Sequence, residues 1–361
     1  MIAREALITD ARKLLCKMVE TPSVTFSEEA VSDCICKALM FWGIRHERIG
    51  NNIICYQNSF DPAKKTLLLC AHMDTVPAAD GYSFDPHAPE NPDMPGAIFG
   101  LGSNDDGGSV AAMLSTLRHY AGTVLPFNLI AAITAQEEKS GPDGVRSLKA
   151  KFKELNVEWC IVGEPTGMQA ATSEKGLLVI DATAKGISGH AARNEGVNAL
   201  YIAIDDINTL RNHTFAKKSG IMEDVHLNVT QINAGTAHNV IPDTCTFVVD
   251  IRPSEAYDNR ELLDELQGLC SSTLTARNLN NRSSATRVGS PLIRCLDRMG
   301  IKTFSSSTTS DWMHLECDAI KMGPGESSRS HNKDEYLLDE ELYEAIDTYI
   351  EFIRNYADTL E

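Results

Sequence analysis

The sequence predicts an α/β domain with a mixed, largely parallel sheet and helices on both faces, interrupted by an inserted α+β domain of ferredoxin-like type. The length of 361 residues exceeds what one ordinary hydrophobic core needs. In the first half of the chain, short apolar runs alternate with segments of helical periodicity, which is typical of a parallel α/β sheet. Near Lys175 the pattern changes to strands with alternating apolar and polar residues, which indicates a second domain.

The predicted α/β domain comprises residues 1–174 and 280–361. It begins with an amphipathic helix in MIAREALITDARKLLCKMVE, and its apolar strands are TLLLCA, NLIAAIT and EWCIVG. Helical patterns between them are SVAAMLSTLRHYA and GVRSLKAKFKEL. After the polar stretch RNLNNRSSATR, the chain returns to a helix in PLIRCLDRMG, an apolar run in DAIKM and a closing helix in DEELYEAIDTYIEFIRNYA.

The inserted domain comprises residues 175–279. Its half-exposed strands are LLVIDATAKG and LNVTQINAG, followed by TCTFVVDIRP. Two helices, VNALYIAIDDINTLR and NRELLDELQGLC, lie between and after them. This β-α-β-β-α order predicts a small open sheet with helices on one face.

The composition is that of a globular protein and excludes several classes of function. The chain is 43% hydrophobic and 23% charged, which separates it from disordered and fibrous proteins. Its formal charge of -17, spread along the chain, argues against a nucleic-acid partner. No apolar stretch approaches the roughly 18 to 20 residues of a membrane span. Charged residues interrupt the apolar positions at the N-terminus, unlike a secretory signal, so we expect a cytoplasmic protein.

The ten cysteines indicate free thiols rather than disulfides. Most stand singly in apolar contexts, and only Cys34 and Cys36 lie close together. We therefore expect buried thiols in a reducing compartment, and the absence of a C-x-x-C motif argues against zinc held by thiolates.

Residues that bind divalent metals follow the apolar runs of the predicted α/β domain. His72 and Asp74 follow TLLLCA, and in an extended chain side chains two positions apart point to the same side. An isolated His-x-Asp is more often a strand entering a polar turn, a lone histidine is more often structural, and a Glu-Glu pair is more often a solvated face. Asp105 lies within the loop GLGSNDDGG, and the candidates that follow the other runs are Glu137, Glu138, Glu164 and His331. Because ligands of open α/β folds gather beyond the carboxyl ends of the strands, we expect all of them to meet at one edge.

This set of residues predicts a two-metal site. Two imidazoles and several carboxylates without a thiolate favour zinc, with cobalt or manganese as substitutes. Five ligands exceed what one open catalytic zinc uses, so we expect Asp105 to bridge two ions. On this interpretation His72 and Glu164 bind one ion, and Glu138 and His331 bind the other.

Two acidic residues remain beside the predicted ligands. Asp74 is placed to accept the second ring N–H of His72 and fix its tautomer, as carboxylates behind a metal-bound histidine do. Glu137 is next to a ligand without being needed as one, so it is free to act as a general base.

Nine motifs in order resemble the acetylornithine deacetylase and succinyl-diaminopimelate desuccinylase family of co-catalytic zinc hydrolases. They are HMDTVP at 72–77, GLGSND at 100–105, QEE at 136–138, GEPT at 163–166, GISGHAA at 186–192, NVIPD at 239–243, DIR at 250–252, TSD at 309–311 and GPGESSRSHNKDEYL at 323–337. The resemblance covers nearly the whole chain. It implies a zinc-peptidase-like catalytic domain with the five ligands above, catalytic roles for Asp74 and Glu137, and a cis peptide after Asp105.

The resemblance also implies that the inserted domain is a dimerisation lid of a homodimer. His190, in GISGHAA, matches a lid histidine that reaches the partner subunit's active site and helps to stabilise the oxyanion. Asn239 and Arg252 match positions that contact substrate, and the planar guanidinium suits a carboxylate. A surface salt bridge is the alternative for Arg252.

The chain departs from the family at one position of its glycine-rich loop. Where the family often shows G-x-G-x-x-D-x-K-G, this sequence has Asp106, Gly107 and Gly108, so the lysine is missing. That lysine is not a ligand, and we expect the metal site to remain intact.

The function implied by the resemblance is removal of the N-acyl group from a small N-acyl amino acid. The ending GPGESSRSHNKDEYL resembles the acetylornithine deacetylase branch, which favours N-acetyl-L-ornithine in arginine biosynthesis. N-succinyl-ornithine, succinyl-diaminopimelate, N-acyl-lysine and dipeptide or carboxypeptidase substrates remain open. A non-catalytic metal-binding protein with this fold is the alternative of a different class, and the intact Glu137 argues against it.

Overall fold

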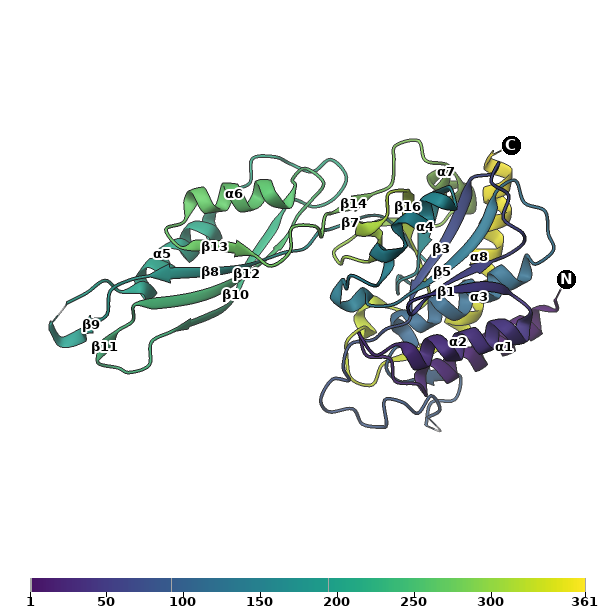
Figure 1. Cartoon of the computed structure of the whole chain (residues 1–361), viewed down its shortest axis with the longest axis horizontal. Helices are drawn as coiled ribbons and strands as arrows, with labels where there is room; N and C mark the ends of the chain where they lie inside the picture. Colours follow the sequence, from purple (N-terminus) through teal and green to yellow (C-terminus); the bar gives the residue numbers. More distant parts are fainter. Residues whose placement is uncertain (1, 92, 194, 361) are drawn as a thin grey trace. The chain divides into compact units, whose positions relative to one another are not determined.

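The structure is a computed structural model that describes residues 2–91, 93–193 and 195–360. The chain forms two compact units, both drawn in Figure 1. Unit 1 consists of Met1–Thr172, Thr286–Phe304 and Ser310–Glu361, and unit 2 consists of Ser173–Ala285 and Ser305–Thr309. The chain therefore leaves unit 1 to build most of unit 2, returns, and leaves it again for a short segment.

A mixed sheet forms the centre of unit 1. Its strands follow the order β1-β2-β5-β3-β6-β16, in which β3 is parallel to β5 and β6, β16 is parallel to β6, and β1 and β2 are antiparallel. Their bounds are β1 Arg45–Ile49, β2 Asn52–Tyr56, β3 Thr66–His72, β5 Asn128–Thr134, β6 Val157–Val162 and β16 Asp318–Lys321. Beyond β16 follow β7 Ala170–Glu174, β14 Ser284–Ala285 and β15 Thr303–Ser306. The predicted mixed, largely parallel sheet is confirmed.

Both faces of this sheet are covered. Every residue of β3 and β5 is buried, which explains why these strands are near-continuous apolar runs. Leu67 contributes to one core cluster and Leu68 to another, because successive side chains of a strand point to opposite faces. Helices pack on these clusters: α1 Arg4–Val19, α2 Glu29–Trp42, α3 Gly108–His119, α7 Pro291–Met299 and α8 Asp339–Leu360 on the first, and α4 Lys149–Glu154 on the second.

The helices differ in how clearly the sequence indicates them. α7 begins at Pro291 after Ser290, whose side chain accepts the N–H of Leu292, and it ends at Gly300 with φ 67°. The sequence patterns do not predict α2 or the hairpin of β1 and β2. The apolar residues of α2 are not confined to its buried side, since Phe41 is exposed. The sequence of this helix therefore lacks a clear amphipathic period. β1 has the sequence RHERI and lacks apolar alternation.

Unit 2 has the element order β8-α5-β10-β12-α6-β13, which is a β-α-β-β-α-β arrangement. The bounds are β8 Leu178–Lys185, α5 Ala199–Asn212, β10 His226–Ala234, β12 Thr244–Arg252, α6 Asn259–Leu269 and β13 Thr273–Ala276. The antiparallel strands follow the order β10-β12-β8-β13. Alternate residues of β8 and β12 form one core cluster with α5 and α6, so both helices cover the same face. This is the α+β fold predicted for the insertion.

Two small sheets complete the structure. In unit 2, β9 Gly189–His190 pairs with β11 Val240–Ile241. In unit 1, β4 Ala97–Phe99 pairs with β17 Tyr336–Leu338. The second pairing brings the chain before the glycine-rich loop beside the chain that follows His331.

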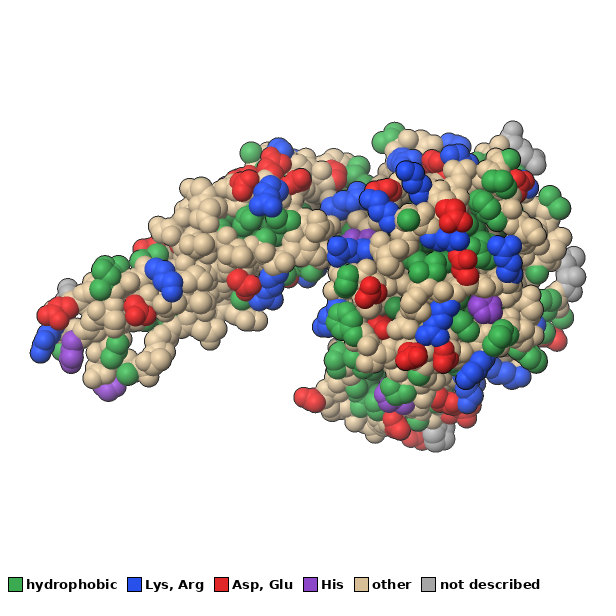
Figure 2. Space-filling view, viewed as in Figure 1, with side chains coloured by type: hydrophobic (Ala, Val, Ile, Leu, Met, Phe, Trp, Pro, Cys, Tyr) green, Lys and Arg blue, Asp and Glu red, His purple; other side chains and the backbone are tan. Residues whose placement is uncertain are grey.

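Charged side chains of both signs are interspersed on the face of unit 1 that Figure 2 shows. Within the described ranges, no helix has both the length and the apolar character that crossing a membrane requires.

Candidate metal centre

The predicted ligands lie beyond the carboxyl ends of three parallel strands of unit 1. His72 is the last residue of β3, Glu137 and Glu138 follow β5 after two intervening residues, and Glu164 follows β6. Because β3 is parallel to both β5 and β6, these ends share one edge of the sheet. Asp105 and His331 reach the same edge from loops.

The side chains at this edge form two groups in which potential ligand atoms lie within 4.8 Å of one another. One group is His72, Asp105 and Glu138, and the other is His72, Glu137 and Glu164. The described structure therefore brings three predicted ligands, Asp105, Glu138 and Glu164, and the predicted base Glu137 together around His72.

Asp105 occupies the position between the two histidines. Its Oδ1 lies 3.1 Å from Nε2 of His72, and its Oδ2 lies 3.6 Å from Nε2 of His331. The same nitrogen of His331 is 3.0 Å from Oε1 of Glu138. One carboxylate that presents an oxygen to each imidazole has the arrangement that a bridging ligand requires.

The electrostatics of the cluster fit divalent cations. Burial, followed by the negative charges around it, raises the pKa of Glu137 well above its ordinary value, and burial does the same for Glu164. Burial opposes the charged form of His72, but its hydrogen bond with Asp105 raises the pKa of the imidazole well above its usual range. The cluster thus favours extra positive charge, and its nitrogen and carboxylate donors are those that zinc, cobalt and manganese accept.

Asp74 supports the site differently from the sequence prediction. Nδ1 of His72 lies 2.9 Å from the backbone carbonyl oxygen of Asp74, whereas the carboxylate Oδ1 is 3.6 Å away. The carboxylate instead accepts the backbone N–H groups of Glu137 and Glu138 at 2.9 and 3.2 Å and the hydroxyl of Thr25 at 2.8 Å. The carboxylate therefore stays near the imidazole, but the predicted hydrogen bond between them is not formed. The backbone oxygen of Asp74 accepts it instead, because other donors engage the carboxylate.

The glycine-rich loop has the cis peptide that the family resemblance implies, between Asp105 and Asp106. The structure also gives a reason for the missing lysine. A Cβ atom at Gly107 would lie 2.4 Å from the carbonyl oxygen of Gly102 and 2.7 Å from Cδ1 of Leu15. The loop as it stands therefore accepts only glycine at the position where the family has lysine.

Two buried carboxylates near the ligands were missed by the sequence reasoning. Asp106 accepts the backbone N–H of His72 at 3.3 Å, and burial raises its pKa to about 8. Glu335 is 2% exposed, and burial raises its pKa to about 8 as well. The sequence signal that could have identified them is their proximity to predicted ligands: Asp106 directly follows Asp105, and Glu335 lies four residues after His331.

The remaining predicted site residues belong to unit 2. His190 and Asn239 are exposed and lie at the small sheet of β9 and β11, where the N–H of Ala191 donates to the carbonyl oxygen of Asn239 at 3.1 Å. Arg252 is half-buried, and its guanidinium contacts the carboxylate of Asp250 at 2.9 and 3.2 Å. The structure thus places His190 and Asn239 close together, and it pairs Arg252 with the carboxylate of Asp250.

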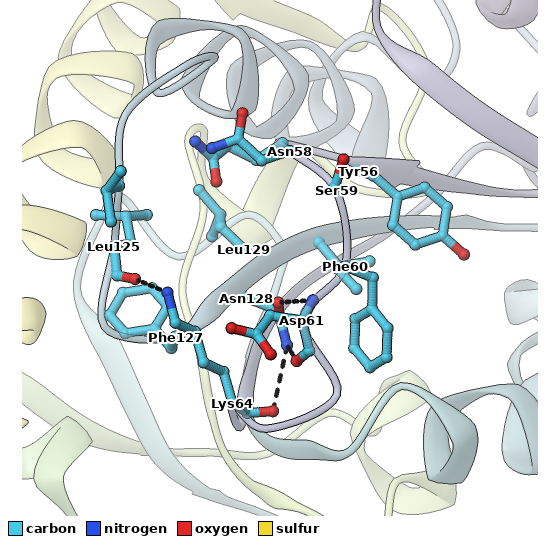
Figure 3. Close-up of a pocket in the computed structure, with 13 residues that line it drawn as sticks. Tyr56, Asn58, Ser59, Phe60, Asp61, Lys64, Leu125, Phe127, Asn128 and Leu129 are labelled. Atoms are coloured by element: carbon cyan, nitrogen blue, oxygen red, sulfur yellow. Dashed lines mark hydrogen bonds between the residues drawn. The ribbon is translucent and has the colours of Figure 1, made fainter.

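A separate cavity of about 180 Å³ in unit 1 differs from this cluster in its chemistry (Figure 3). Its polar groups form hydrogen bonds with one another. Nζ of Lys64 donates to the backbone carbonyl oxygen of Leu125 at 2.8 Å, and the side-chain amide of Asn128 donates to the backbone carbonyl oxygen of Asp61 at 2.9 Å. Asn128 begins β5, whereas the predicted ligands follow the end of that strand. This cavity is therefore not the candidate site.

Comparisons with known proteins identify the family and a curated relative. The model of the family described as Peptidase family M20/M25/M40 matches residues 68–355. An acetylornithine deacetylase from Shigella sonnei (strain Ss046) is 28% identical over 359 residues, covering 89% of this chain and 91% of that protein.

Solved structures show the same fold. The aminopeptidase PepT from Bacillus cereus ATCC 10987 has a TM-score of 0.78 at 18% identity, covering 99% of this chain and 100% of that one. The YXEP protein of Bacillus subtilis, described as a dinuclear metal binding peptidase from the M20 family, has a TM-score of 0.70 at 16% identity over 98% of both chains.

Proposed function

The chain belongs to peptidase family M20/M25/M40 and is a metal-dependent hydrolase, and from this premise we propose that it removes the N-acyl group of an N-acyl amino acid. The observation that carries the proposal is Asp105, whose two oxygens face His72 and His331 while further carboxylates surround them. A binding protein would need ligands, but it would not need Glu137 beside them.

We propose that the centre holds two zinc ions, for which cobalt or manganese can substitute. Asp105 would bridge them, with His72 and Glu164 on one side and Glu138 and His331 on the other. When bound, such a pair of divalent cations acidifies a water molecule and polarises the carbonyl of the scissile amide.

Glu137 is the proposed general base. It removes the proton from the attacking water and returns it to the nitrogen of the leaving amine. A raised pKa suits this exchange, because the group must both accept and release a proton near neutral pH. Asp74, which accepts the backbone N–H of Glu137 at 2.9 Å, would hold the base in place.

Unit 2 is proposed to supply the remaining contacts. In the homodimer proposed below, His190 would reach the partner subunit's active site and stabilise the oxyanion there. Asn239 and Arg252 would bind the substrate, with the guanidinium directed to the α-carboxylate. For Arg252 this requires that the carboxylate of Asp250 share the guanidinium with the substrate or release it.

N-acetyl-L-ornithine is the proposed substrate, with L-ornithine and acetate as products in arginine biosynthesis. The support is the curated relative and the sequence GPGESSRSHNKDEYL around His331. N-succinyl-ornithine, succinyl-diaminopimelate, N-acyl-lysine and dipeptides are the alternatives.

We also propose a homodimer formed through unit 2. β10 is an edge strand of its sheet, so one row of backbone N–H and C=O groups has no strand partner among the described residues. Large apolar side chains are exposed in this unit, with Ile232 on β10 46% exposed and Tyr201 on α5 66% exposed. Pairing of two such edges would cover both features.

The test is hydrolysis by the zinc-loaded protein across the five substrate classes named above. Release of acetate from N-acetyl-L-ornithine at the highest kcat/KM is the expected result. If another substrate is cleaved at a higher kcat/KM, that compound replaces N-acetyl-L-ornithine as the assigned substrate. No turnover on any of them with zinc bound would favour the non-catalytic metal-binding protein.

A further inference from the structure

Glu335 connects the loop that carries Asp105 to the segment that carries His331. Its Oε1 accepts the backbone N–H groups of Asn104 and Asp105, both at 2.9 Å, and its Oε2 accepts that of Gly102 at 3.1 Å. Its backbone carbonyl oxygen accepts a fourth bond, from the N–H of Gly100 at 2.8 Å. One buried residue thus receives four N–H groups from a single loop.

The backbone around Glu335 is itself anchored. The next residue, Tyr336, begins β17 and lies opposite Phe99 in the pairing with β4. On the other side of the loop, the amide of Asn104 accepts the N–H of Glu326 at 3.0 Å and donates to the carbonyl oxygen of Glu326 at 3.1 Å. The loop is therefore held between two parts of the segment that contains His331.

The bond from Asp105 is the one that matters for the metal centre. Its N–H points to Glu335, while its carboxylate presents one oxygen to His72 at 3.1 Å and the other to His331 at 3.6 Å. Residue 105 is thus fixed from behind at its backbone, and its side chain extends to both imidazoles.

Glutamine is nearly the same size as glutamate but does not reproduce these bonds. Each oxygen of Glu335 accepts from a backbone donor, and an amide replaces one oxygen with an NH2 group that can only donate. One buried N–H group would then face another donor, which is unfavourable.

We propose that Glu335 is a positioning residue of the metal centre, which orients Asp105 so that its two oxygens face both metal positions. The inference rests on the proposed function only in taking Asp105 as the shared ligand. It requires no particular substrate.

The test compares zinc affinity in wild-type protein and in Glu335→Gln, measured by competition with a zinc-chelating dye. Outer carboxylates of this kind typically contribute 10–100-fold to metal affinity, and we expect a loss of about that size. The visible spectrum of the cobalt-loaded variant should also change, because the ligand geometry at the metal changes. Asp318→Asn is the matched control: Asp318 is also buried and accepts a backbone N–H, from Arg287 at 2.8 Å, but it begins β16. We expect its zinc affinity and cobalt spectrum to match the wild type.

Wild-type affinity and an unchanged cobalt spectrum in Glu335→Gln would overturn the inference, even if the variant melts at a lower temperature. If that variant does not fold, Glu335→Asp decides the question: it keeps the carboxyl group but is one methylene too short to reach all three side-chain partners, so wild-type affinity there would also overturn it. Wild-type protein that binds two zinc ions and cleaves no amide contradicts the proposed function but not this inference. Wild-type protein that binds no zinc contradicts both.

Discussion

Replacing Glu137 with glutamine should remove most of the turnover and leave both metals bound. The substitution keeps the volume of the side chain and the backbone N–H that donates to Asp74 at 2.9 Å. It removes the group that takes the proton from water. It also removes an ionisable group from a site where burial, followed by the neighbouring carboxylates, raises the pKa of Glu137.

The magnitude follows from the role. A positioned general base contributes about 10²–10⁴-fold to the rate. At about 1.36 kcal/mol per factor of ten, this corresponds to roughly 3–5 kcal/mol in the activation free energy. KM should change little, because the lost contact is to the attacking water and not to the substrate.

The assay measures bound zinc by elemental analysis and steady-state release of acetate from N-acetyl-L-ornithine. Glu47→Gln is the control, since Glu47 is half-buried on β1 and accepts the hydroxyl of Tyr56 at 3.0 Å. Normal turnover in Glu137→Gln would refute the general-base role. Loss of zinc in that variant would make Glu137 a ligand, which its grouping with His72 and Glu164 makes the sharpest alternative.

Three further predictions concern the loop, the pH dependence and the assembly. Gly107→Ala should lower the melting temperature, because the added Cβ would lie 2.4 Å from the carbonyl oxygen of Gly102. Such overpacking costs about 1–3 kcal/mol of stability, and an unchanged melting temperature would contradict the clash. Without metal, the protein should lose stability as pH rises through about 8, because Asp106 and Glu335 have pKa values raised to about 8 and bind more protons folded than unfolded. Thermal melts in EDTA at pH values below and above 8 measure this loss of stability, and a melting temperature that rises with pH would refute it. Ile232→Lys, on edge strand β10, should turn a dimer into a monomer by light scattering, whereas a monomeric wild type would contradict the dimer.

Much of the fold and the chemistry of the candidate site were readable from local pattern. A strand buried on both faces has to be apolar throughout, so TLLLCA and NLIAAIT indicate central strands of a covered sheet. Polar residues at or just beyond the ends of these apolar runs, among them His72 and Glu164, indicated a site at the strand ends. The hairpin of β1 and β2 escaped prediction because β1 is charged and half-exposed, and its pairing is set by the neighbouring strand.

The sequence by itself determined the fold class and the donor types of the site, because periodicity and residue chemistry are local properties. Only the tertiary structure decided which atoms meet. It placed the backbone oxygen of Asp74 on the imidazole of His72 and gave the carboxylate to other donors. It brought the carbonyl of Gly102 too close to position 107 for any side chain. It set Glu335 behind Asp105 across 230 residues of chain, and contacts between segments so far apart depend on three-dimensional packing, which no local pattern encodes.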